Sequence, residues 1–250
     1  MTKDELRMKR FVVADLHFGH ENIIKYEKRP FADYREMDKK LIEDWNSIVG
    51  KNDLVYVLGD FTLTRRKELI TRLVNKLNGR KVLIMGNHDT RKPKDYIECG
   101  FEVATRKPMM VEPGVILMHE PFNDDSLIYG NYIYFFGHVH ANRTMMDDYR
   151  NCMCVSVERV DYKPVDLDKA IRKLRKEKMR RELDGMYFRF DNESICFSDL
   201  TEKQQDEVME NRDIEWFKRM CKHLAKVLKQ IGDEFDIVSN SVDEEGGHDN

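Results

Sequence analysis

The chain has 250 residues, of which 41% are hydrophobic and 36% are charged, and its formal net charge is -3. This length accommodates one well-buried domain, or one domain with an added terminal piece. The composition is that of a polar globular protein and excludes the disordered and fibrous classes. The near balance of acidic and basic residues gives no overall sign of nucleic-acid binding.

Neither the apolar runs nor the cysteines indicate a membrane or secreted protein. No segment approaches the about 18 consecutive apolar residues that a membrane span needs. The cysteine count of 5 is odd and the chain contains no CxxC pair, which argues against a disulfide framework and a structural zinc knuckle. We therefore expect an unanchored, cytoplasmic protein with reduced thiols.

Residues 10 to about 160 alternate short apolar runs with stretches of helical periodicity, the pattern of an α/β layered domain. Five runs predict buried strands: RFVVAD (10–15), DLVYVLGD (53–60), KVLIMGN (81–87), GVILMHE (114–120) and YIYFFGH (132–138). Apolar residues at helical spacing predict one helix over 35–49 and another over 69–77. The run CMCVSVERV predicts a further strand, which the proline of DYKPVD ends.

The C-terminal third predicts helices and a tail. We expect a helix from Asp166 to about Leu183, a turn and a short strand in DGMYFRFDNES, and a second amphipathic helix between Thr201 and Gly232. The chain should thus have a core domain over 1–165, a helical extension over 166–232 and a disordered acidic tail over 233–250. The extension would pack on the core or on a partner subunit, and the second case would make a homo-oligomer.

Histidines, carboxylates and an amide gather where the predicted strands end. In chain order the five strands are followed by Asp15, His17 and His20; by Asp60; by Asn87 and His88; by His119; and by His138 and His140. Open α/β sheets bind ligands at the carboxyl ends of their strands. Each histidine alone is more simply a hydrogen-bonded loop residue, but together they need a common partner because buried polar groups are costly when unpaired. A metal centre is such a partner.

The number of candidate ligands indicates two ions. The candidates are Asp15, His17, Asp60, Asn87, His119, His138 and His140. One ion with an open position cannot use them all, whereas two ions about 3.5 to 4 Å apart with a bridging carboxylate can. This mixed nitrogen and oxygen set favours Mn²⁺, with Fe, Zn²⁺, Ni²⁺ and Co²⁺ as alternatives, over Mg²⁺ or Ca²⁺. Since two-metal sites suit in-line displacement at phosphorus, hydrolysis of a phosphate ester is the first reaction to consider.

The ordered motifs D-x-H (15–17), GD (59–60), GNHD (86–89), a lone His119 and GHxH (137–140) resemble those of the calcineurin-like metallophosphoesterase superfamily. The stretch HFGHENIIKYEKRPF (17–31) resembles the small bacterial and phage-type members of that superfamily. The resemblance covers residues 10 to about 160 and implies a four-layer αββα sandwich, here with an α-rich C-terminal extension. It also implies that one ion is held by Asp15, His17 and His140, the other by Asn87, His119 and His138, and that Asp60 bridges them. His88 would stabilise or protonate the leaving oxygen.

The second motif departs from the pattern of the protein phosphatases. Those members extend it to GDxxDRG, whereas this chain has GDFTLTRR and lacks both the aspartate that would orient His88 and the arginine of that motif. Asp89 is the adjacent candidate for orienting His88. Further candidates for supporting the ligands or contacting the substrate are His20, Asn22, Arg29 and one of Arg65 and Arg66; a solvated loop side chain is the alternative for each arginine.

These expectations describe a dinuclear phosphoesterase in which a water or hydroxide that bridges the ions attacks phosphorus in line and His88 assists the leaving group. The substrate would be a small phosphate monoester or diester, and the sequence leaves that choice open. One alternative is a metal-dependent nuclease, although the basic face of the helix from Asp166 is better explained as a solvated surface than as a nucleic-acid contact. The other is a catalytically silent scaffold, which the complete ligand set disfavours.

Overall fold

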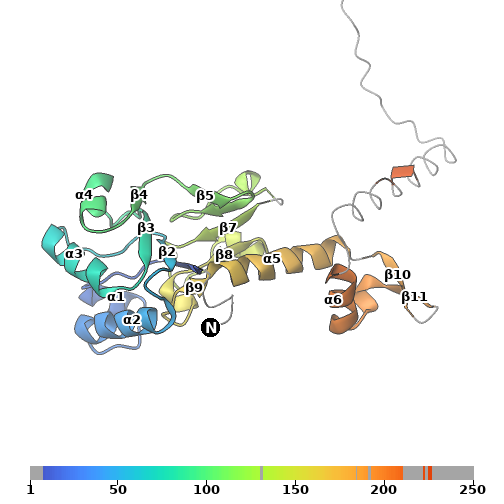
Figure 1. Cartoon of the computed structure of the whole chain (residues 1–250), viewed down its shortest axis with the longest axis horizontal. Helices are drawn as coiled ribbons and strands as arrows, with labels where there is room; N and C mark the ends of the chain where they lie inside the picture. Colours follow the sequence, from blue (N-terminus) through green and yellow to red (C-terminus); the bar gives the residue numbers. More distant parts are fainter. Residues whose placement is uncertain are drawn as a thin grey trace, which may run out of the picture. The chain divides into compact units, whose positions relative to one another are not determined.

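The structure is a computed structural model in which residues 8–129, 132–183, 185–190, 193–210, 222 and 225–226 are described. The chain forms two compact units that divide between Lys178 and Met179. Within the described residues, the first unit contains two β-sheets flanked by helices, and the second contains a hairpin and a short helix (Figure 1).

The first sheet contains β1 (Arg10–Val13), β2 (Leu54–Val57), β3 (Arg80–Ile84), β4 (Val103–Thr105) and β9 (Val165–Asp166), in the order β4-β3-β2-β1-β9. Strands β1 to β4 run parallel, and β9 pairs antiparallel with β1. The register places Tyr56 between Val12 and Val82. Because central parallel strands are covered on both faces, β1, β2 and β3 are continuous apolar runs rather than alternating ones.

The second sheet contains β5 (Met109–Glu112), β6 (Val115–Leu117), β7 (Ile133–Phe136) and β8 (Cys152–Cys154), in that order. Strands β6 to β8 run parallel, and β5 pairs antiparallel with β6. An isolated bridge between Ala14 and Ser156 joins the ends of β1 and β8. The bridge brings the carboxyl ends of the parallel strands of both sheets to one edge of the unit.

Four helices lie on the outer side of the first sheet: α1 (Glu21–Tyr26), α2 (Tyr34–Ile48), α3 (Lys67–Lys76) and α4 (Pro93–Glu98) (Figure 1). Helix α2 begins after Asp33, whose carboxylate accepts hydrogen bonds from the backbone N–H groups of Arg35 and Glu36. Its apolar stripe, which includes Leu41 and Trp45, is buried against the sheet. Each such side chain stabilises the fold by about 1.5 to 3 kcal/mol.

Helix α5 (Leu167–Glu182) begins at the amino-terminal ends of the strands. Three of its apolar residues join the core between the two sheets: Leu167, Ile171 and Leu174. Arg10, the first residue of β1, forms ion pairs with Asp168 on α5 and with Glu112 on β5. The first turns of α5 therefore belong to the first unit, whereas the extension predicted from the sequence begins at residue 166. The three-part division of the chain stays a prediction.

The outer face of the second sheet packs against short 3-10 helices and loops in the described part of the chain. These include η1 (Asp125–Leu127) and η2 (Met145–Asp148). Met146 of η2 is fully buried with Tyr134 and Phe136 of β7. Two mixed sheets with helices confirm the expected α/β fold class, although this outer layer is thinner than one built of long helices.

Some local structure differs from the sequence prediction. The hydrophobic pattern does not predict α1, α4, β4 or β5, all of which are too short for a clear period. The run CMCVSVERV forms only β8 and then η3 (Val157–Arg159), because the chain turns Ser156 and Glu158 toward the loop after β1. Pro164 precedes β9 instead of ending a strand.

The second unit has its own small core. It contains the hairpin of β10 (Tyr187–Phe190) and β11 (Glu193–Cys196), then η4 (Phe197–Asp199) and α6 (Glu202–Glu210). Its buried apolar residues are Leu183, Phe188, Phe197, Leu200, Val208 and Met209. The short strand predicted in this region is thus a hairpin. The predicted helix over 201–232 begins with α6, but most of its length and the tail over 233–250 lie outside the described residues.

Candidate metal centre

The predicted ligands lie at the carboxyl ends of β1, β2, β3, β6 and β7, where the backbone turns sharply. Five of them have a positive φ: Asp15 (60°), His17 (52°), Asp60 (53°), His138 (72°) and His140 (53°). This conformation costs a non-glycine residue about 1 to 2 kcal/mol. Such a concentration of backbone strain on predicted ligands indicates that these side chains are aimed for a function rather than for stability.

The first group of side chains is Asp15, His17 and His140, whose ligand atoms lie within 4.8 Å of one another. Asp15 Oδ2 accepts hydrogen bonds from Ser156 Oγ at 2.6 Å and from the backbone N–H of His138 at 2.9 Å. In contrast, Asp15 Oδ1 and His17 Nε2 are buried without a hydrogen-bond partner among the described residues. Because unpaired buried polar atoms are costly, these two atoms fit a divalent cation.

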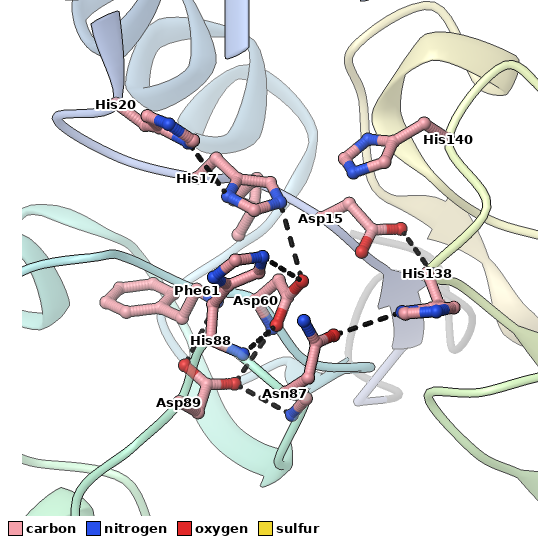
Figure 2. A network of polar contacts seen from close by, with 12 residues as sticks. Asp15, His17, His20, Asp60, Phe61, Asn87, His88, Asp89, His138 and His140 are labelled. Carbon is pink, nitrogen blue, oxygen red and sulfur yellow. Dashed lines mark hydrogen bonds and ion pairs between the residues drawn. The ribbon is translucent and has the colours of Figure 1, made fainter. Parts of the chain in front are cut away.

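The second group is Asp60, His119 and His138. The amide of Asn87 lies beside Asp60 and His138 (Figure 2). The Nδ1–H of His119 donates to the carbonyl of Leu58 at 2.8 Å. The lone pair of the ring is therefore on Nε2, where it can bind a metal ion. That Nε2 lies 3.0 Å from Asn87 Oδ1 and 3.2 Å from His138 Nδ1. Asn87 Oδ1 and His138 Nδ1 are 3.0 Å apart. Three ligand atoms thus converge as they do around one cation.

Asp60 lies between the two groups. Its Oδ2 is 3.5 Å from His17 Nε2 of the first group and 3.7 Å from His119 Nε2 of the second. Its Oδ1 accepts a hydrogen bond from the backbone N–H of His88 at 2.9 Å (Figure 2). The free oxygen of one carboxylate therefore faces ligand atoms of both groups, which is the position of a bridging ligand.

The electrostatics of the site also fit bound cations. Burial raises the pKa of the Asp15 carboxyl to about 7, because the ionised form is poorly solvated there. Burial lowers the pKa of His17 far below its usual range and also lowers that of His119, so both rings are held neutral. Neutral imidazoles and carboxylates that lack a counter-charge are the forms that ligate metals.

Asp89 supports Asp60, and no hydrogen bond or ion pair between described residues joins its carboxylate to the His88 ring. Its Oδ2 accepts hydrogen bonds from the backbone N–H groups of Asp60 at 2.8 Å and Gly86 at 2.9 Å, and its Oδ1 accepts one from Phe61 at 3.2 Å. The residue is fully buried. Asp89 therefore ties the loop after β2 to the loop after β3, and the role considered for it, orienting His88, receives no support from these contacts.

Arg29 is also a supporting residue. Its guanidinium is buried and contacts Glu158 Oε1 through Nε at 2.8 Å and Nη2 at 2.6 Å. It also donates to the carbonyls of Leu16 at 3.0 Å and Asp15 at 2.8 Å. Glu158 Oε1 in turn lies 3.0 Å from His140 Nδ1, which directs Nε2 of that ring toward the first group. With its donors used in this way, Arg29 fits the supporting role better than a phosphate contact.

The remaining candidates lie farther out. His88 projects beside Asp60, with 45% of its side chain exposed and Nε2 at 4.0 Å from Asp60 Oδ2. His20 Nδ1 lies 3.3 Å from His17 Nδ1 and so supports that ligand. Asn22 is exposed on α1, and no hydrogen bond between described residues joins it to the site. Arg65 and Arg66 are exposed before α3.

Two motif glycines are required by close approach of the chain. A Cβ on Gly59 would lie 2.4 Å from His119 Nδ1, and Gly59 also has a positive φ of 78°. A Cβ on Gly86 would lie 2.3 Å from Asp60 Oδ1 and 2.7 Å from His119 Cε1. Gly86 therefore provides room for two ligands.

A pocket of about 530 Å³ opens beside the second ligand group. Its lining includes Asn87, His119, Glu120, Phe122 and Arg106. Arg106 follows β4, the neighbour of β3, and its Nη2 donates to the carbonyl of Asp89 at 3.1 Å. The volume lies within the range of about 300 to 1,000 Å³ that is usual for small-molecule sites.

Three supporting residues escape the sequence analysis: Ser156, Glu158 and Arg106. A signal for the first two does exist, since CMCVSVERV is a sixth apolar run that ends in polar residues, as the five other runs do. For Arg106 the signal is weak, because β4 has only three residues.

Comparisons with known proteins identify similar chains. The model of the calcineurin-like phosphoesterase family matches residues 8–138. The uncharacterized protein MJ1445 of Methanocaldococcus jannaschii is 37% identical over 185 residues, which are 71% of this chain and 98% of that protein. The gene 66 protein of Mycobacterium phage L5 is 42% identical over 83 residues, 32% of this chain and 39% of the phage protein.

A solved structure is also similar. The crystal structure of AQ665, a protein of unknown function from Aquifex aeolicus, matches with a TM-score of 0.54 and 28% identity. The match covers 67% of this chain and 100% of that one. Among the described residues, no helix has the length and apolar character needed to cross a membrane.

Proposed function

The chain belongs to the calcineurin-like phosphoesterase family, and from that premise we propose that it is a dinuclear metal-dependent hydrolase of phosphate esters. The observation that carries the proposal is the division of the ligands into two groups with Asp60 between them. A catalytically silent scaffold is disfavoured, because all the predicted ligands are present and several are held in a strained backbone conformation.

The two groups would each hold one ion. Asp15, His17 and His140 suit the first, and Asn87, His119 and His138 suit the second. The mixture of imidazole, carboxylate and amide donors favours Mn²⁺, with Fe, Zn²⁺, Ni²⁺ and Co²⁺ as alternatives. When bound, such ions stabilise negative charge on phosphoryl oxygens and lower the pKa of water, so that water can attack phosphorus in line.

His88 is the residue that we assign to the leaving group. Its ring is half-exposed at the rim of the site, and its backbone N–H is fixed by Asp60 Oδ1. From this position Nε2 can donate a proton to the departing ester oxygen while the ligand residues remain in place. The position that holds the second aspartate of GDxxDRG is here Leu63, which is exposed, so that loop supplies no carboxylate to orient His88.

We place the enzyme in the cytoplasm and assign it a small substrate. The described cysteines Cys99, Cys152, Cys154 and Cys196 are free thiols, as a reducing compartment requires. The pocket beside Asn87 and His119 accommodates a small phosphate monoester or diester.

Turnover of para-nitrophenyl phosphate and of bis(para-nitrophenyl) phosphate by the Mn²⁺-loaded protein tests the proposal. We expect hydrolysis of at least one ester and its loss on chelation. His88→Ala should lower kcat by about 10² to 10⁴-fold, the usual contribution of a general acid, with an unchanged metal content. Unaltered kcat in His88→Ala would refute the assigned role, and absence of hydrolysis of both esters would refute the proposed function.

A further inference from the structure

A basic pocket lies next to the candidate metal centre. It has a volume of about 460 Å³ and is lined by Arg65, Thr90, Arg91, Lys92, Lys94 and Asp95. The acidic residue of this lining is already paired, since Asp95 Oδ2 lies 3.3 Å from Arg91 Nη2 and Asp95 Oδ1 lies 3.5 Å from Lys67 Nζ. The pocket therefore carries a surplus of positive charge.

Three of its cations form no ion pair with another described residue. No ion pair between described residues includes Arg65, Lys92 or Lys94. In addition, Arg91 Nε is buried and lacks a hydrogen-bond acceptor among the described residues. Basic side chains that are gathered in a concave surface without acidic partners attract anions.

The basic pocket and the pocket at the metal ligands have no lining residue in common, but hydrogen bonds of Arg106 connect them. Thr90 follows His88 in a turn in which its N–H donates to the carbonyl of His88 at 3.0 Å. Arg106 Nη2 donates to the carbonyls of both Asp89, at 3.1 Å, and Arg91, at 3.2 Å. Arg106 also lines the pocket that contains Asn87, so it stands between the two pockets. The lining of the basic pocket thus includes Thr90, two residues after His88 in the same turn.

We propose that the basic pocket binds a second phosphate group of the substrate, carried by the part of the substrate that leaves from His88. This inference rests on the proposed function, because the role of His88 defines the leaving side. The substrate would be a phosphate ester whose alcohol leaving group bears a further phosphate. Arginine and lysine recognise phosphate through charge-assisted hydrogen bonds. A phosphate ligand would therefore explain why four basic residues line the basic pocket.

Two sources would present this chemistry. A small nucleotide-like ester with two phosphates would fill the two neighbouring pockets, and a single nucleic-acid strand would place consecutive phosphates in them. The cations of the basic pocket suit both sources. The pocket lining includes no aromatic side chain for base stacking, so it offers no additional contact that would single out a nucleic-acid strand.

Binding to the Mn²⁺-loaded protein tests the second-phosphate site without requiring turnover. The probes are adenosine 3′,5′-bisphosphate and adenosine 3′-monophosphate, compared by isothermal titration calorimetry. The variant is the triple Arg65→Gln, Lys92→Gln, Lys94→Gln. The control is the triple Lys169→Gln, Arg172→Gln, Lys173→Gln, which changes net charge equally on exposed positions of α5.

We expect the unmodified protein and the control to bind the bisphosphate at least about tenfold more tightly than the monophosphate. In the pocket variant that preference should fall below about threefold, because its phosphate contacts are removed. Equal preference in the pocket variant and the control would overturn the proposal. So would the absence of any preference in the unmodified protein, even if it hydrolyses simple esters.

Turnover then separates the sources. A dinucleotide with and without a terminal phosphate is compared with a single strand of about twelve nucleotides, a typical length for a strand-binding groove. Faster cleavage of the phosphorylated dinucleotide than of the strand assigns a small substrate, and the reverse assigns a nuclease. Equal kcat/KM for the two dinucleotides would contradict the second-phosphate site. The proposed function is tested separately, by the hydrolysis of the simple para-nitrophenyl esters.

Discussion

At the level of single residues, the ligands are fixed through one atom and leave another atom free. Asp15 uses Oδ2 to accept from Ser156, His119 uses Nδ1 to donate to Leu58, and His140 places Nδ1 beside Glu158. The free atoms face the interior of the site. Fixing ligands in this way lowers the entropy that ordering them would cost when an ion binds.

Glu158→Gln should weaken both the fold and the first ion site. The change leaves the buried guanidinium of Arg29 without a full counter-charge, so we expect a loss of about 3 kcal/mol in the free energy of unfolding. Because His140 loses its anionic partner, Mn²⁺ affinity should fall about 10 to 100-fold. Urea unfolding and calorimetric Mn²⁺ titration measure the two effects.

Glu102→Gln is the matched control for this change. The ion pair of Glu102 with Arg80 is exposed, so its loss should cost less than about 1 kcal/mol. If Glu158→Gln and Glu102→Gln have the same effect on stability and Mn²⁺ affinity, the supporting role of Glu158 is wrong.

Gly86→Ala should disturb two ligands at once. The added methyl would overlap Asp60 Oδ1 and His119 Cε1, and relieving such overlaps costs about 1 to 3 kcal/mol. We therefore expect a lower free energy of unfolding and fewer bound Mn²⁺ ions per chain. Gly50→Ala, which meets only the flexible side chain of Asp53, serves as the control. Retention of full metal content in Gly86→Ala would contradict the packing explanation.

At the level of elements, α2 holds the loop that follows β1. Asp38 of α2 accepts a hydrogen bond from the backbone N–H of Gly19 at 2.9 Å. Burial raises the pKa of the Asp38 carboxyl to about 6, against the effect of that hydrogen bond. A carboxyl whose pKa is higher in the folded than in the unfolded state contributes stability at low pH, and this contribution is lost as the pH rises from about 4 to 6.

Asp38→Asn tests this element contact through pH. The amide stays neutral and its oxygen can still accept from Gly19, so the variant should lose less stability than the unmodified protein between pH 4 and 7. We expect the difference between the two proteins to change by about 1 to 3 kcal/mol across this range. Urea unfolding at both pH values measures it, and parallel pH profiles of the two proteins would show that Asp38 does not titrate as described.

The strands and the loops that follow them also explain which residues of the site could be predicted from the sequence. The ligands could be located because each follows an apolar strand run, and parallel strands deliver their carboxyl ends to one edge. The polar end of the next apolar run is a signal for Glu158, but that run reads as one strand, so its pattern does not show that Ser156 turns toward Asp15 and η3 follows. Arg106 depends on β4, whose pairing with β3 is set by tertiary contacts rather than by local pattern. The contacts of Asp89 likewise join loops 29 residues apart in the chain.

At the level of the whole molecule, the first unit contains every residue of the site. A chain that ends at Lys178 should keep the melting temperature of the first unit and its Mn²⁺ content. A chain that ends at 165 should not fold cooperatively, because it lacks Leu167, Ile171 and Leu174 of the core between the sheets. Each contributes about 1.5 to 3 kcal/mol to a total stability of about 5 to 15 kcal/mol.

Circular dichroism melts and metal analysis of the two shortened chains measure this difference. Cooperative folding of the chain that ends at 165 would show that α5 belongs to an extension, as the sequence suggests. Light scattering of the full and Lys178-terminated chains also tests the predicted homo-oligomer, which should become a monomer if the second unit forms it.

The central claim is that two ions are held side by side with Asp60 between their ligand groups. Its most direct test is electron paramagnetic resonance of the Mn²⁺-loaded protein, together with the number of ions bound per chain. We expect two ions per chain and the spectrum of an exchange-coupled pair, and we expect Asp60→Asn to lose the coupling. One ion per chain, or two ions without coupling in the unmodified protein, would contradict the claim.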